Sequence, residues 1–265
     1  MMRLLRIELN KILYNRTVWI MFGLYVFLFA LSALALDGIV NSMNVNSGDN
    51  SSIGKMLLGG MSVFSFPGIW HNMAYMASLF KILLAVIVIT LVINEYNYRT
   101  LRQNIIDGMS KWEIIWAKEL VILLLSLLSV FIYLATTLLF GKNFGNIGVV
   151  TGLEYTFAYF VTLFLYLNFA YFLSTWIKKS GLVITILLAY SLIIENVVTY
   201  YLPDQISDFL PMNVMGNMIP NPFRELVGLS ASQDFLMINA GVCVVYTTLF
   251  IGLNQWMLKT GYAKK

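Results

Sequence analysis

Charged residues are scarce in this sequence of 265 residues, since only 11% are Asp, Glu, Lys or Arg while 59% are hydrophobic. An average soluble domain is about half apolar and about a quarter charged. A soluble fold of this size has no interior large enough to hide such an excess, so lipid must surround much of the surface. The formal net charge of +4 is modest, and the basic residues are not clustered as a nucleic-acid-binding protein requires.

Cysteine and histidine are almost missing, which excludes several kinds of chemistry. Cys243 cannot form an internal disulfide, and one Cys with one His cannot build a metal site. His71 lies in a predicted loop, where an interfacial polar contact is favoured over catalysis. A zinc protease needs His-Glu-x-x-His, and an intramembrane serine protease needs a histidine within a span. We therefore expect no catalytic residue, no cofactor and no metal.

Proline is missing from every long apolar run, and all five prolines lie between the runs. A helix that crosses about 30 Å of hydrocarbon needs roughly 20 mostly apolar residues. The first run could be mistaken for a cleaved signal peptide, but its apolar core exceeds the roughly 7–15 residues of a signal sequence. The sequence predicts an all-α polytopic membrane protein, one domain over residues 1–265, with six unbroken transmembrane helices at Thr17–Leu36, Ala74–Ile93, Leu120–Phe140, Tyr155–Trp176, Leu182–Tyr201 and Phe235–Met257.

Lys and Arg predict the orientation. Four precede the first span, four lie between spans two and three, two follow span four and three follow span six. Only three fall in the loops on the other side, and Lys81 lies within a span. Because cytoplasmic loops carry the excess of Lys and Arg, both termini are expected in the cytoplasm, with the protein in the plasma (inner) membrane.

Two segments outside the spans have apolar character. Residues 1–15 predict a short interfacial helix whose basic side, with Arg3, Arg6 and Lys11, faces anionic headgroups. The alternative is that they are only the cytoplasmic start of the first span. Residues 202–234 carry four of the five prolines between apolar residues, which favours a re-entrant outer segment before the last span.

The segment 94–112, between spans two and three, carries the most information. Its first part predicts a helix with Tyr98, Leu101 and Ile105 on one face and Arg99, Arg102 and Asn104 on another. Asp107-Gly108 then breaks the helix. Ser110 is a predicted N-cap, and Glu113 three residues later completes a capping box for the next helix. We expect a cytoplasmic helix of this kind to be a binding site for a soluble partner.

Here the chain resembles the permease subunits of ATP-binding-cassette exporters of the second type. Their pattern has a glutamate at the end of span two, a Gly-Thr-Leu element, a Pro-Ser-Arg-like turn and a lysine entering span three. Glu95, Thr100-Leu101, Ser110-Lys111 and Lys118 occupy those places. The departures are Arg99 in place of glycine, Met109 in place of proline and Lys111 in place of arginine.

The resemblance implies a coupling helix over Tyr98–Asp107 that rests in a groove of an ATP-binding subunit. It also implies a second permease copy or a sister permease. The chain has no Gly-x-x-x-x-Gly-Lys-Ser/Thr phosphate loop, so ATP must be split by the partner. Alternatively, the charges of this loop are only a solvated face and an inside-positive anchor. The predicted docking residues are Glu95, Tyr98, Arg99, Thr100, Leu101, Arg102, Asn104, Ile105 and Asp107, in which Glu95 and Arg99 can pair with each other or with the partner.

Lys81, Asn168 and Glu195 fall inside the predicted spans, where ionisable groups are costly. Lys81 and Glu195 lie about 10 Å and about 9 Å from the outer ends of their spans, which suggests an ion pair between the two helices. The alternative is that Lys81 extends toward the outer surface and Glu195 meets the polar outer segment. Asn168 is predicted to form an interhelical hydrogen bond.

These features favour a transport subunit that exports an amphiphilic substrate. The alternative is an ion-coupled carrier or channel, which the sparse intramembrane charge, the unbroken helices and the missing internal repeat disfavour.

Overall fold

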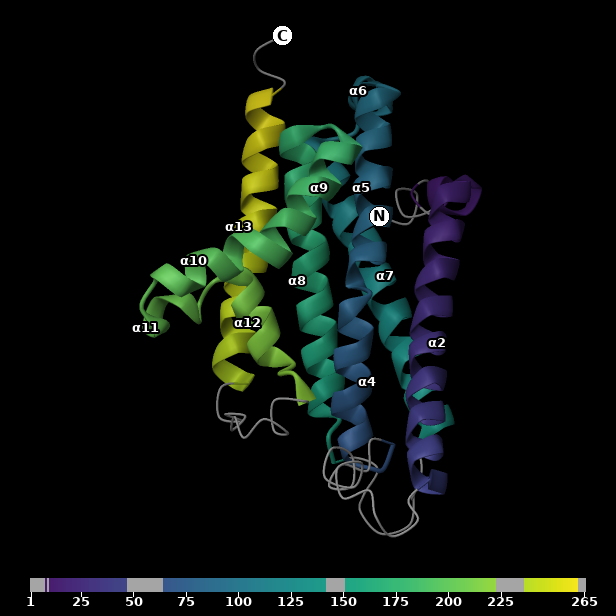
Figure 1. The fold of residues 1–265 in the computed structure, drawn as a ribbon. Helices are drawn as coiled ribbons and strands as arrows, with labels where there is room; N and C mark the ends of the chain where they lie inside the picture. The colour runs from purple at the N-terminus through teal and green to yellow at the C-terminus, as the bar shows by residue number, and fades with distance from the viewer. Residues whose placement is uncertain (1–7, 9, 47–63, 142–150, 223–235, 262–265) are drawn as a thin grey trace.

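The computed structural model describes residue 8 and residues 10–46, 64–141, 151–222 and 236–261. These residues form helices and connecting turns without a strand (Figure 1). Arg3 and Arg6, together with residues 223–234 of the predicted re-entrant segment and Phe235 of the predicted last span, lie outside the described residues. The all-helical architecture that the composition predicts is confirmed for the described part of the chain.

Five helical segments are long and apolar enough to cross a membrane, which makes this a membrane protein. Four are continuous helices: α2 (Arg16–Asn46), α7 (Lys111–Phe140), α8 (Glu154–Ile177) and α13 (Leu236–Gly261). The fifth, Ser180–Tyr201, is built from α9 (Ser180–Ala189), the π-helical turn η1 (Tyr190–Ile194) and α10 (Glu195–Tyr201).

The predicted second span is divided into α4 (Gly68–Leu79) and α5 (Lys81–Asn97), which are bent by 42° at Phe80. The backbone N–H of Phe80 donates to the carbonyl of Ala77, three residues back, so the α-helical ladder is interrupted there. The expectation of unbroken spans is therefore wrong at two places, this bend and η1. Neither place contains proline or glycine, the usual sequence signals for a kink.

The central helix is α8, which packs against α4, α5, α7, α12 and α13 (Figure 1). Buried side chains lie on all of its faces, as expected for a helix enclosed by others. Three buried hydroxyls join it to its neighbours: Tyr25 of α2 lies 2.6 Å from Ser129 of α7 and 2.9 Å from Tyr159 of α8, and Ser129 lies 2.6 Å from Tyr159. This cluster fixes α2, α7 and α8 relative to one another.

Two short helices follow α10. Figure 1 shows α10 and α11 (Asp204–Ser207) projecting from the side of the bundle, after which the chain returns through α12 (Pro211–Met218). Pro211 is the first residue of α12, where its missing N–H costs nothing. Because Val214, Met215 and Met218 are buried and α12 packs against α13 and α8, this segment belongs to the protein core.

The start of α2, the helix α6 (Thr100–Ile106) and the end of α13 lie at one end of the bundle (Figure 1). Helix α4 begins at the opposite end. Lys and Arg residues also predict that the terminal regions and the loop 94–112 share one side.

Candidate functional site

The loop between α5 and α7 contains the short helix α6, which is framed by two left-handed residues. Arg99 has φ 57° and precedes the helix, while Gly108 has φ 91° and follows it. Helix α6 spans Thr100–Ile106 instead of the predicted Tyr98–Asp107, because the left-handed Arg99 turns the chain before the helix begins. The predicted break at Asp107-Gly108 is confirmed.

The predicted capping box at the start of α7 is also confirmed. The backbone N–H of Ser110 donates to Oε2 of Glu113 over 2.8 Å, and the N–H of Glu113 donates to Oγ of Ser110 over 3.2 Å. The box satisfies two backbone donors that have no partner inside the helix. It therefore fixes the point at which the loop re-enters the bundle.

Helix α6 has one buried side and one exposed side. Leu101 is buried against Ile114 and Ile115 of α7, with Ile105 and Met109 at the edge of the cluster. On the outside, Tyr98 and Ile106 are 76% and 77% exposed. The sequence predicts Tyr98 beside Leu101 and Ile105, but the turn at Arg99 moves it to the exposed side. Arg99, Arg102 and Asp107 are exposed there too, and Asn104 is half-buried.

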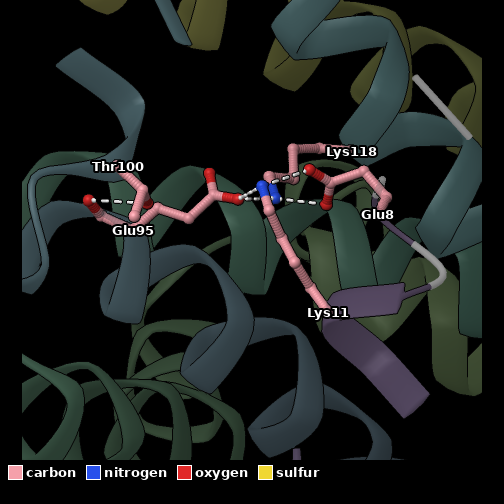
Figure 2. Close-up of polar contacts among 5 residues, drawn as sticks. All are labelled: Glu8, Lys11, Glu95, Thr100 and Lys118. Carbon is pink, nitrogen blue, oxygen red and sulfur yellow. Dashed lines mark hydrogen bonds and ion pairs between the residues drawn. The ribbon is translucent and has the colours of Figure 1, made fainter. Parts of the chain in front are cut away.

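Next to α6 lies a network of four charged side chains, Glu8, Lys11, Glu95 and Lys118 (Figure 2). Lys118 Nζ lies 2.5 Å from Glu8 Oε2 and 2.6 Å from Glu95 Oε1. Lys11 Nζ lies 2.8 Å from Glu8 Oε1 and 2.6 Å from Glu95 Oε1. Each carboxylate therefore contacts both ammonium groups, and the four formal charges cancel.

The network is largely removed from water, since Glu8, Glu95 and Lys118 are buried and only Lys11 is half-buried. Burial by itself would raise the pKa of Glu8, but the ammonium groups of Lys118 and Lys11 outweigh it and lower this pKa below 4.5. Burial would likewise lower the pKa of Lys11, but the Glu95 and Glu8 carboxylates raise it above 10.5. Both groups therefore stay ionised at neutral pH.

The network joins three parts of the chain that are distant in sequence: the segment before α2, the end of α5 and the first turns of α7. It also reaches α6, because the Thr100 hydroxyl donates to the backbone carbonyl of Glu95 over 3.5 Å (Figure 2). Glu95 contacts the two lysines and not Arg99, which corrects the possibility of a Glu95–Arg99 pair. Lys11, predicted to face headgroups, is directed into this network.

Sequence reasoning missed Glu8 and did not assign Lys118 to an ion pair. Glu8 is separated from Lys118 by 110 positions, so no local spacing connects them. The only local signal is the Glu8–Lys11 spacing of three residues, typical of an ion pair on a helix. A second missed residue is Glu119, a buried carboxyl in the apolar run of α7.

The predicted Lys81–Glu195 ion pair is not formed, whereas the alternative contact of Glu195 with the outer segment 202–234 is. Lys81 Nζ lies 4.8 Å from the centre of the Tyr166 ring, and Glu195 accepts a 2.7 Å hydrogen bond from the backbone N–H of Asn213. Lys81 and Glu195 are within electrostatic range but form no direct ion pair. The Asn168 amide nitrogen donates to the carbonyl of Phe164 in its own helix, so this bond is not interhelical.

Among the residues that the structure describes, no group of three His, Cys, Asp or Glu side chains is placed to hold a metal ion.

A sequence-family model described as protein of unknown function (DUF2705) matches residues 59–259. The match includes α6 and two members of the charged network, Glu95 and Lys118, whereas Glu8 and Lys11 precede it. No curated protein matches the chain.

Proposed function

This chain belongs to the DUF2705 family, and we propose that it is the membrane-spanning permease subunit of an ATP-binding-cassette exporter of the second type. The observation that carries the proposal is α6, a short helix at one end of the bundle that has a buried anchor, Leu101, and an exposed apolar side chain, Ile106, with the exposed Tyr98 just before the helix. Its position corresponds to the coupling helix that the sequence resemblance implies.

In this proposal the protein crosses the plasma (inner) membrane six times. The bent pair α4–α5 is counted as one span, in addition to the five segments that are each long enough to cross. Both termini and α6 lie in the cytoplasm, in agreement with the distribution of Lys and Arg. On the opposite side, α11 and α12 form the described part of the re-entrant segment before the last span.

Helix α6 has the properties of a docking element. Tyr98 and Ile106 are exposed by about three quarters, and an aromatic and an aliphatic side chain of this kind anchor well in a partner's pocket. Arg99 and Arg102 beside them carry positive charge, which steers association with an acidic groove. Leu101 holds the helix on α7, so a force applied to α6 is passed to the bundle.

In this proposal, the charged network transmits that force to the neighbouring helices. Removing one member of a buried ion pair is costly because the other charge is left uncompensated, so the four side chains resist separation. They link α6 to α5, to α7 and to the segment before α2. We infer that these elements move together when the partner closes on ATP.

Arg99 supports the family resemblance in a second way. The exporter permeases that this chain resembles have glycine at this position, and glycine adopts positive φ without strain. Arg99 has φ 57°, so the backbone retains the conformation that glycine favours although the side chain differs.

The substrate in this proposal is an amphiphile moved outward, because the spans have apolar walls and few charges. The energy comes from ATP bound by a separate subunit, and the transporter contains a second copy of this permease or a sister permease.

The test is affinity purification of the tagged chain from its native membrane in mild detergent, with identification of stoichiometric partners. We expect an ATP-binding subunit with the native chain. The double variant Tyr98→Ser/Ile106→Ser should weaken its retention at least about tenfold, since the two side chains are proposed anchors.

The matched control is Tyr14→Ser, which removes a tyrosine that is 87% exposed but lies outside α6. This control should retain the partner fully. Repeated recovery of the native chain alone in good yield, or equal loss of the partner in the control, would argue against the permease assignment.

A second candidate, an ion-coupled carrier, is favoured by one observation. Interrupted helices at the binding site are typical of secondary transporters, and here α5 begins with Lys81 after the bend while α10 begins with Glu195 after η1. Recovery of a stable ATP-binding partner separates the two functions.

A further inference from the structure

Glu119 is a buried carboxyl that neither the charged network nor the docking helix uses. It lies eight residues after the start of α7, about 12 Å along the helix. The side chain is buried, and neither of its carboxyl oxygens has a hydrogen-bond partner among the residues that the structure describes. Buried polar groups are nearly always hydrogen-bonded, so two unpartnered oxygens on one side chain require an explanation.

The neighbouring polar group belongs to α8. The side-chain amide of Asn168 interacts with the Glu119 carboxyl across the α7–α8 interface, without meeting the geometry of a hydrogen bond. The amide nitrogen of Asn168 is occupied by the Phe164 carbonyl at 3.0 Å, while its oxygen is buried and unpartnered. Three oxygens therefore meet at this interface without a donor.

An ionised Glu119 would leave three acceptors and one uncompensated negative charge in an apolar environment. That cost is so large that a buried carboxyl without a cation takes up a proton instead. A protonated carboxyl has one O–H donor, and the unpartnered oxygen of Asn168 is an acceptor for it. A metal ion fits less well, because Ca²⁺ takes six to eight oxygen ligands and Mg²⁺ about six.

The titratable groups nearby do not supply the missing charge. On α8, the Tyr171 phenol lies within electrostatic range of Glu119 and of the network carboxylates Glu8 and Glu95. Lys118 and Lys11 are engaged by those carboxylates, and the Lys178 ammonium lies 5.2 Å from the centre of the Tyr96 ring of α5. The described buried side of α13 offers only Cys243, and α2 and α4 contact α7 farther along, at Ser129 and Tyr133.

We propose that Glu119 and Asn168 form an intramembrane proton-binding site, in which Glu119 is protonated at neutral pH and donates to the Asn168 side-chain oxygen. The site is independent of the exporter assignment, because it rests on the α7–α8 interface and needs no partner. Its proton keeps this interface neutral, and losing the proton would place a charge between two packed helices.

The first measurement is infrared spectroscopy of the purified full chain at about pH 7, where an exposed glutamate is almost fully ionised. We expect the carbonyl band of a protonated carboxylic acid, absent in Glu119→Gln. Asn168→Leu should keep the band and shift it to the frequency of a carboxyl without a hydrogen bond. The matched control Glu154→Gln changes an exposed carboxyl and should leave the band unchanged.

The second measurement uses a hydrophobic carbodiimide, which reacts with protonated carboxyls, followed by peptide mass spectrometry. At about pH 6 an ordinary glutamate is only about 2% protonated, so Glu119 should be labelled at least about tenfold more than Glu154. This comparison is made within one native molecule and does not depend on a variant that folds. Equal labelling, or a native spectrum without the band, would overturn the proposal.

Discussion

At the scale of single residues, the charged network is the feature with the largest expected energetic effect. Glu95→Gln or Lys118→Gln alone leaves an unbalanced charge in a buried site, which should cost on the order of 2–4 kcal/mol. The double variant restores neutrality, because Glu8 and Lys11 remain as a pair. It should therefore cost less than the sum of the single changes by about 1–3 kcal/mol.

Thermal unfolding of the four proteins in one detergent measures this coupling. Arg102→Gln is the control, since it removes an exposed charge near the same loop and should change stability by less than about 0.5 kcal/mol. Additive effects of the two single variants would mean that Glu95 and Lys118 do not stabilise each other.

The same network predicts how pH acts on the segment before α2. The lowered pKa of Glu8 gives stability that is present above pH 4.5 and is lost as pH falls through that lowered pKa. The raised pKa of Lys11 gives stability that is present below pH 10.5 and is lost as pH rises through the raised pKa. The segment should therefore stay attached between these limits and detach beyond either.

A spin label at Tyr14→Cys, in a Cys243→Ala background, reports this detachment as increased mobility. Glu8→Gln should abolish the acid transition while keeping the alkaline one, because Lys11 still contacts Glu95. An unchanged acid transition in Glu8→Gln would assign it to another group.

Residue-level predictions from sequence succeed where the partners are local. Ser110 and Glu113 are three residues apart, so the capping box follows from their spacing. Glu8 and Lys118 meet only because the segment before α2 packs against α7, and no sequence spacing encodes that contact. For the same reason, the cation–π contact of Lys81 with Tyr166 was not foreseen.

At the scale of elements, variants of α6 should distinguish the side chain that anchors the helix on α7 from the side chain that is proposed to bind the partner. Leu101→Ala removes a buried side chain and should cost about 2–3 kcal/mol, exposing the loop to hydrogen exchange. Ile106→Ser removes an exposed one and should leave both stability and exchange nearly unchanged. Stability and the exchange of residues 98–110 distinguish the two variants, whereas both variants should weaken the proposed partner's binding.

Hydrogen-exchange mass spectrometry of the purified chain checks this difference. If Ile106→Ser loosens the loop as much as Leu101→Ala, Ile106 has a structural role and is not a docking residue.

Element positions were predictable because hydropathy directly reflects the lipid environment. Each of the six predicted apolar runs overlaps described helices, with boundaries that differ by several residues, and Phe235 at the start of the last run lies outside the described residues. The bend at Phe80 and the π-helical turn at Tyr190–Ile194 were not predictable, because they arise from packing and have no proline or glycine signal.

At the scale of the whole molecule, the two ends of the bundle are chemically different. One end carries α6 and the other carries the start of α4 (Figure 1). The four-charge network is joined to α6 through the bond between Thr100 and Glu95. If the first end is cytoplasmic, single cysteines there should react with a membrane-impermeant maleimide only after the membrane is opened. Suitable positions are Ile106→Cys and Tyr14→Cys, both at exposed side chains.

The opposite end provides the complementary position, Glu154→Cys at the start of α8, where the native side chain is exposed. In intact cells of a Cys243→Ala background, this cysteine should be labelled without opening the membrane. The experiment tests the orientation and whether the number of spans between residues 14 and 154 is odd, because opposite labelling requires an odd number. Equal labelling of positions 106 and 154 from outside would mean that α7 does not cross, and α6 would then be unable to reach a cytoplasmic ATP-binding subunit.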